Sequence, residues 1–151
     1  MKKRGILNKE LNDVIASMGH TDRIIISDVG FPIPEGVRRV DLALTDEIPD
    51  TETVLKLIEK EFIAEEIYVA EDVFVNNKPL YESIQSIFEG VNINGIPHED
   101  ILTKEAHKAK AVIRTGSYNP WGNIVLQSGV DVKKFFNRSG VVTPDYYKDK
   151  M

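Results

Sequence analysis

The sequence predicts an α/β fold in three layers (α/β/α), with a mostly parallel, mixed central sheet between two layers of helices. Segments with apolar residues at helical spacing alternate along the chain with short runs rich in β-branched residues, as in folds built from alternating helices and strands. One run, Ile24–Ile26, has three consecutive β-branched residues, which suits a strand covered on both faces, as in a parallel sheet. At 151 residues the chain is long enough for one domain with its own core.

The first half of the chain contains two helix signals and three strand signals. Asn8 is a candidate N-cap of a helix that runs to Met18, and Gly19 is the expected C-terminal stop. The Ile24–Ile26 strand follows, and alternating apolar residues predict a second strand over 39–44. Asp50 is a candidate cap of a helix that runs to about residue 62, and a third strand is expected over 67–70.

The second half continues the alternation. Asn77 opens a helix with a proline in its first turn, a weaker strand is expected over 91–93, and a helix over 98–108. Two late strands, over 111–114 and 123–126, are joined by a loop. The order of these signals predicts a domain over residues 1–130.

Residues 131–151 differ in composition and are expected to form a C-terminal tail extension. They contain four aromatic residues, one glycine, one proline and several charges. A partly ordered surface tail is the interpretation that statistics of chain termini favour. The alternative is an arm that packs its aromatic residues on a neighbouring subunit.

Composition excludes several classes of protein. The chain has no cysteine, so disulfides, a thiolate nucleophile and cysteine-based metal sites are ruled out. A net charge of −5 argues against general affinity for nucleic acid, which needs clustered basic surface. No apolar run approaches the ~20 residues of a membrane span, and the basic N-terminus lacks the apolar region of a signal peptide. We therefore expect a soluble, cytoplasmic protein with neither a nucleic-acid nor a membrane partner.

The segment G-H-T-D-R-I-I-I-S-D places a histidine before the Ile24–Ile26 strand and an aspartate after it. His20 and Asp28 are eight residues apart, so a straight strand at ~3.3 Å per residue separates them by roughly 20 Å or more. They can cooperate only if the chain curls back or a second subunit brings one to the other. Position alone favours a structural role for His20 as a cap on helix-terminal carbonyls. Asp28 lies at the carboxyl end of a strand, where ligands bind in open α/β sheets.

Few other residues are candidates for catalysis or binding. His98 follows Pro97 at a helix start, where the dipole favours a neutral imidazole, although an exposed first-turn histidine is an equal alternative. His107 is expected at the surface. The chain contains neither a glycine-rich phosphate loop nor a metalloprotease histidine pair. Proton transfer by histidine with aspartate, without cofactor or metal, is the chemistry that remains.

The loop R-T-G-S-Y-N-P-W-G-N, residues 114–123, places an aromatic face beside amide groups. A sugar site uses these features, because an aromatic ring stacks on apolar C–H faces while amides bond hydroxyls. A Pro/Gly/Asn-rich connection with one packed tryptophan, Trp121, is an equal alternative.

Together these blocks resemble the D-ribose pyranase family, which is related to L-fucose mutarotase. The resemblance rests on K-K-R-G-I-L-N, G-H-T-D, I-S-D-V-G-F-P-I-P, D-L-A-L, His98–Glu99 and A-V-I-R-T-G…P-W-G-N-I-V-L-Q-S-G-V, in order over residues 1 to about 130. It implies an isomerase that interconverts the pyranose and furanose forms, and the anomers, of ribose without metal or cofactor. It also implies a homo-oligomer, often pentameric rings stacked into decamers, with sites where subunits meet.

The resemblance assigns roles to individual positions. His20 corresponds to the proton donor, and the residues expected to bind the sugar are Asp28, His98, Trp121, Gly122 and Asn123. Two of these positions depart from the family pattern, which usually has tyrosine at 121 and commonly has alanine at 122. Indole offers only an N–H donor where a phenol both donates and accepts. A mutarotase for another sugar such as L-fucose, or a sugar-binding ring protein impaired in catalysis, therefore remains an alternative function.

Overall fold

Six strands form one central sheet in a structure that describes all 151 residues and is a computed structural model. The strands are β1 (Arg23–Ser27), β2 (Arg38–Asp41), β3 (Ala64–Ala70), β4 (Asn92–Ile96), β5 (Ala111–Arg114) and β6 (Ile124–Ser128). Their order across the sheet is β2-β5-β1-β6-β3-β4. β6 is antiparallel to both of its neighbours, whereas all other pairs are parallel. The predicted mixed, mostly parallel sheet is confirmed.

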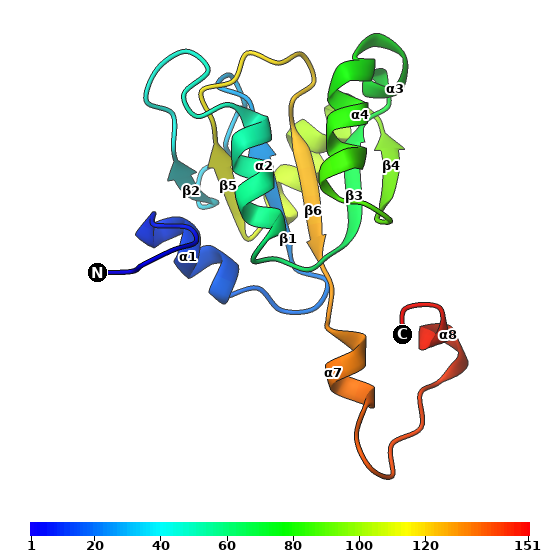
Figure 1. Cartoon of the computed structure of the whole chain (residues 1–151). Coiled ribbons are helices and arrows are strands. Elements are labelled where there is room, and N and C mark those ends of the chain that lie inside the picture. Colours follow the sequence, from blue (N-terminus) through cyan, green and yellow to red (C-terminus); the bar gives the residue numbers. More distant parts are fainter.

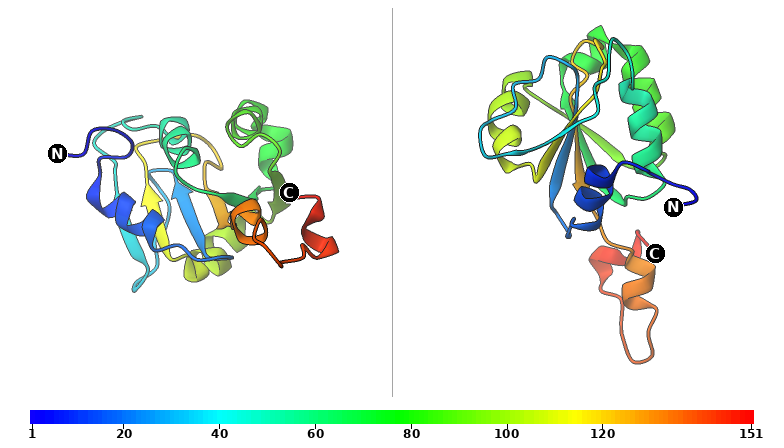
Figure 2. Two further views of the ribbon diagram at one scale, coloured as in Figure 1. Left: turned by 60° about the horizontal axis from the view of Figure 1, so that its bottom comes forward. Right: turned by 90° about the vertical axis from the view of Figure 1, so that its left-hand side faces the viewer.

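Helices cover both faces of this sheet, which gives the three predicted layers (Figure 1; Figure 2). The helices are α1 (Lys9–Ala16), α2 (Thr51–Glu59), α3 (Asp72–Asn76), α4 (Lys78–Ile87), α5 (His98–Asp100), α6 (Ala106–Lys108), α7 (Val132–Phe136) and α8 (Asp145–Lys148). A π-helical turn, η1 (Ile101–Glu105), joins α5 to α6. α2 and α4 lie on one face, and α5–η1–α6 lies on the other. None of these helices is both long and apolar enough to cross a membrane.

The central strands are buried on both faces. Ile24, Ile25 and Ile26 of β1 have no exposed surface, and neither do the first three residues of β6. Because water is excluded from both faces, these strands are continuously apolar rather than alternating. Full burial of each such side chain contributes about 1.5–3 kcal/mol, so this strand pair anchors the fold.

Several predicted boundaries were wrong. α1 ends at Ala16 with Ser17 as its C-cap, so Gly19 is not the helix stop. β2 ends at Asp41 rather than residue 44, because its partner β5 ends opposite at Arg114. The short helix α3 was missed, and the helix expected over 98–108 contains the π-helical turn.

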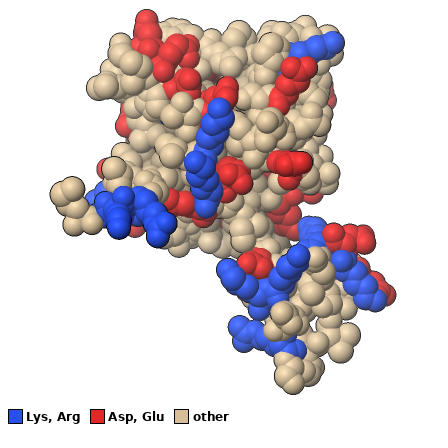
Figure 3. Space-filling model, viewed as in Figure 1, with Lys and Arg blue, Asp and Glu red and all other residues tan.

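The C-terminal tail leaves the body at the end of β6 and folds back on itself (Figure 1). Phe136 of α7 and Tyr147 of α8 pack with ring centroids 5.3 Å apart. Lysines and arginines are prominent on the tail surface, and acidic residues lie on the part of the body next to the tail (Figure 3). One of them, Lys150, pairs with Glu65 of β3. The division at residue 130 remains a prediction.

Candidate functional site

Asp28 and Asn123 form a reciprocal pair at one edge of the sheet. Asp28 follows β1 and Asn123 precedes β6, and the antiparallel pairing of these strands makes them neighbours. The Asp28 backbone N–H donates to Asn123 Oδ1 at 3.0 Å, and Asn123 Nδ2 donates to Asp28 Oδ2 at 2.9 Å. Asn123 is only 2% exposed, whereas Asp28 is half-buried. The buried amide therefore orients the carboxylate, which keeps lone pairs for a ligand hydroxyl.

The turn before Asn123 holds Trp121 in a conformation that non-glycine residues rarely adopt. Its φ is +56°, and the turn is closed by a hydrogen bond of 2.9 Å from Gly122 N to Asn119 O. Asn77, the N-cap of α4, donates to Asn119 Oδ1 at 2.7 Å and anchors the turn. Trp121 packs partly against the core and is half-buried.

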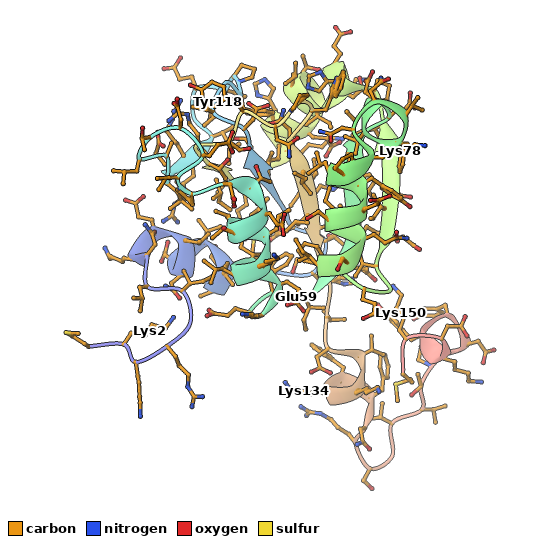
Figure 4. All side chains as sticks on the ribbon, turned by 45° about the horizontal axis from the view of Figure 1, so that its top comes forward. Lys2, Glu59, Lys78, Tyr118, Lys134 and Lys150 are labelled. Carbon is orange, nitrogen blue, oxygen red and sulfur yellow. The ribbon has the colours of Figure 1, made fainter.

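The backbone next to this tryptophan leaves little room for a side chain at Gly122. A Cβ on Gly122 would lie 2.6 Å from the carbonyl oxygen of Asn119, closer than such atoms approach. Tyr118 of the same loop is 61% exposed, and its backbone N–H donates to Glu47 Oε1 at 2.8 Å. It lies at the end of the molecule opposite Lys150 (Figure 4).

His98 begins α5 after Pro97, as predicted, and this helix follows β4 at the same edge of the sheet as Asp28. Its Nε2 is buried and has no hydrogen-bond partner within the chain. A buried polar atom without a hydrogen-bond partner lowers the free energy of unfolding by about 1–3 kcal/mol. A ligand group that bonds this nitrogen is therefore favoured at this position. β4 and β1 are three places apart in the sheet, which corresponds to about 14 Å. The structure therefore places Asp28, Trp121 and Asn123 together and His98 further along the same edge.

His20 lies at the opposite edge, in a turn that is fixed from several sides. The Gly19 N–H donates to Asp22 Oδ2 at 2.7 Å, and Thr21, with φ of +69°, donates its N–H to Ser128 O at 2.9 Å. Lys110 Nζ also donates to Asp22 Oδ2, at 2.6 Å. The Lys110 hydrogen bond, aided by the Gly19 N–H, holds the pKa of Asp22 below its usual value. The G-H-T-D motif thus builds a fixed platform for one histidine.

The ring of His20 bonds to a carboxylate, not to helix carbonyls, so the expectation of a helix-cap role was wrong. His20 Nε2 lies 2.9 Å from Glu65 Oε2, at the start of β3. Glu65 is 17% exposed in its side chain and also accepts a hydrogen bond from Lys150. This Lys150 bond lowers the pKa of Glu65, outweighing burial, which raises it; His20 lowers it further.

Sequence reasoning missed Glu65, because 45 residues separate it from His20 and the contact depends on the order of strands. A cavity of about 380 Å³ lies beside this pair, between the body and the tail. The charged residues that line this cavity are Glu65, Asp131, Lys133 and Lys150. No group of three or more histidines and carboxylates is positioned to share a metal ion.

Comparisons with known proteins all point to one family. The profile of the RbsD / FucU transport protein family matches residues 1–131. D-ribose pyranase 2 of Rubrobacter xylanophilus is 51% identical over 150 residues, covering 99% of this chain and 97% of the relative. D-ribose pyranase of Geobacillus thermodenitrificans is 48% identical over 133 residues, covering 87% of this chain and 98% of the relative. The first relative therefore extends through the tail, and the second matches little beyond the body.

Solved structures share the fold. RbsD of Bacillus subtilis, complexed with D-ribose, superposes with a TM-score of 0.81 at 36% identity, covering 86% of this chain and 98% of that one. The fucose mutarotase of Streptococcus pneumoniae, in complex with L-fucose, has a TM-score of 0.70 at 20% identity, covering 82% and 94%. At that identity the second likeness concerns the fold alone.

Proposed function

This chain belongs to the RbsD / FucU transport protein family, and from that membership we propose that it is a D-ribose pyranase, an isomerase that interconverts the pyranose and furanose forms of D-ribose. The observation that carries the proposal is the 51% identity, over 99% of the chain, to a relative named D-ribose pyranase 2. The L-fucose structure, at 20% identity, gives no comparable support for a fucose mutarotase. A cytoplasmic location is part of the proposal.

The reaction needs only proton transfer. The ring oxygen gains a proton while the anomeric hydroxyl loses one, the ring C–O bond breaks, and the open-chain aldehyde forms. Attack on that aldehyde by a different hydroxyl then closes the other ring size. An imidazole serves both directions, because its unperturbed pKa of ~6.5 lies near neutrality. General acid–base catalysis of this kind typically raises the reaction rate by about 10²–10⁴-fold. We assign it to His20.

Substrate binding is assigned to the opposite edge of the sheet. Asp28, oriented by Asn123, accepts from sugar hydroxyls, and the Trp121 ring stacks on a C–H face. His98, whose Nε2 has no partner in the chain, is assigned to the sugar because the family resemblance implies it. Gly122 is assigned to the sugar because the family resemblance implies it. Within one chain these groups lie too far from His20 to share one ribose.

A head-to-tail assembly removes this separation. If the edge that carries His20 in one protomer docks on the edge that carries Asp28 in the next, each interface contains both groups. Contacts of this kind use two different surfaces, so they form a ring where the rotation between protomers closes, rather than a two-fold dimer. We propose pentameric rings that stack into a decamer, the assembly that the family resemblance implies.

Exchange spectroscopy tests the activity directly. Saturation-transfer NMR on D-ribose measures the rate at which pyranose and furanose signals exchange, with and without the protein, and L-fucose is the matched second sugar. We expect accelerated exchange for ribose, and loss of that acceleration in His20→Ala. Acceleration only for L-fucose anomers would replace the proposal with a fucose mutarotase. Ribose binding without exchange would indicate a sugar-binding protein.

A further inference from the structure

We propose that Glu65 is the positioning residue of His20, that Lys150 of the C-terminal tail supports it, and that Nδ1 of His20 is therefore the nitrogen that exchanges protons with the sugar. This inference rests on the proposed function, in which His20 is the proton donor. It adds two residues to that site, one from the start of β3 and one from the penultimate position of the chain.

Three titratable side chains carry the inference. Glu65 accepts from His20 Nε2 through Oε2, at 2.9 Å, and from Lys150 Nζ through Oε1. Each carboxylate oxygen thus has its own donor, and the carboxylate is held between two cationic or cationisable groups. The side chain of Glu65 is 17% exposed, so this arrangement is less screened by water than a surface ion pair.

The hydrogen bond to Glu65 decides which ring nitrogen of neutral His20 carries the proton. An ionised carboxylate can only accept, so Nε2 must be the donor. The lone pair of the neutral ring then lies on Nδ1, and no hydrogen bond of the chain reaches that atom. Nδ1 therefore accepts the proton of the anomeric hydroxyl, and the imidazolium that forms donates it to the ring oxygen. The His20 side chain is 37% exposed, so its ring is open to solvent at this edge of the sheet. Carboxylates orient catalytic imidazoles in this way in other enzymes.

Lys150 keeps Glu65 in the form that this role requires. Its hydrogen bond is the largest cause of the lowered pKa of Glu65, and burial acts in the opposite direction. Of the other charged groups nearby, Asp131 and Lys133 line the same cavity. The hydrogen bond to Glu65 raises the pKa of Lys150, and the charge of Glu66 raises it further. The tail therefore contributes to proton transfer although it lies outside the shared body of the family.

Three variants of the full chain test the inference. Glu65→Gln removes the charge but keeps the shape, and its amide either donates to or accepts from the ring. Lys150→Met removes the tail cation. Lys148→Met is the matched control, because Lys148 pairs only with Asp145 inside the tail.

The first measurement is the tautomer of His20, from long-range ¹H–¹⁵N NMR on the sugar-free protein. We expect the Nε2–H form alone in the wild type and in Lys148→Met, and a mixture of both tautomers in Glu65→Gln. A single Nε2–H form in Glu65→Gln would overturn the positioning role. Because no sugar is present, this result is independent of the proposed activity.

The second measurement is the rate of ribose ring exchange at saturating sugar. We expect kcat to fall about tenfold or more in Glu65→Gln, with KM changed less than about twofold, because orientation of the proton donor is lost rather than sugar binding. The kcat of Lys150→Met should be about two- to fivefold lower than that of the wild type. The kcat of Lys148→Met should match the wild type. An unchanged kcat in Glu65→Gln or Lys150→Met contradicts the corresponding role. Absence of wild-type exchange would instead refute the proposed function.

Discussion

His20 and Asp28 lie at opposite ends of the buried strand β1, so one chain presents the proposed proton donor and the proposed sugar ligand at opposite edges of the sheet. Both side chains are fixed by partners from other strands, His20 by Glu65 of β3 and Asp28 by Asn123 before β6. Neither can therefore move the length of the strand to reach the other. The predictions below follow from this arrangement and from the contacts at each edge.

Complementation between inactive variants tests the shared site. His20→Ala and Asp28→Asn are each expected to lose ribose exchange, but rings that contain both protomers regain sites that combine an intact His20 with an intact Asp28. Random mixing gives roughly a quarter of such sites. The measurement is ribose exchange by NMR after co-expression of the two variants.

The control for complementation is co-expression of His20→Ala with the double variant that also carries Asp28→Asn, which cannot rebuild any site. Activity in the mixture no higher than in this control would show that the two residues do not meet across an interface.

Trp121 is the only tryptophan of the chain, so its fluorescence reports on the proposed sugar site alone. The Trp121 side chain is half-buried in the turn that precedes Asn123, and stacking on a sugar changes its surroundings. We expect ribose to change the emission in a saturable way, and to do so also in His20→Ala, which keeps the binding edge. Emission that does not respond to ribose while NMR detects binding would remove Trp121 from the site.

Gly122→Ala tests the tight turn next to Trp121. The new Cβ would lie 2.6 Å from Asn119 O, so the backbone must shift, at a cost of about 1–3 kcal/mol in the free energy of unfolding. Urea denaturation measures this cost. Gly30→Ala is the control, because the nearest atom to its new Cβ is Asp28 Oδ1 at 3.6 Å. Equal stabilities of the two variants would show that the turn adapts without strain.

Acid should weaken the platform that carries His20. Lys110 lowers the pKa of Asp22 from its ordinary value of 3.8, and a carboxyl with a depressed pKa stabilises the fold above that value. The stabilisation is lost as the pH falls below 3.8 through the lower, folded-state pKa. The free energy of unfolding should therefore fall less steeply with acid in Lys110→Met than in the wild type.

Urea denaturation at a series of acidic pH values measures this slope. Lys3→Met is the control, since Lys3 has no ion-pair partner in the chain, and it should follow the wild type. A slope in Lys110→Met as steep as in the wild type would show that the Lys110–Asp22 pair does not contribute to acid stability.

Much of the fold could be predicted from the sequence because local patterns carry it. Continuous apolar residues indicated that Ile24–Ile26 are buried on both faces, and the bounds of β5 matched the prediction of a strand over 111–114. Predicted strand ends were wrong where a neighbouring strand sets the end. For example, β2 ends at Asp41 because its partner β5 ends opposite it. Strand order and the antiparallel direction of β6 are not encoded in any single segment.

The sequence by itself determined the family resemblance, the α/β class and the separation of His20 from Asp28 along one strand, because these depend on residue identity, periodicity and the length of extended chain. Only the tertiary structure decided the partners of these two residues. Asp28 bonds Asn123 across 95 positions, and Glu65 joins His20 to Lys150 across 45 and 85 positions. Contacts over such separations depend on the order and direction of strands in the sheet, which local patterns do not specify.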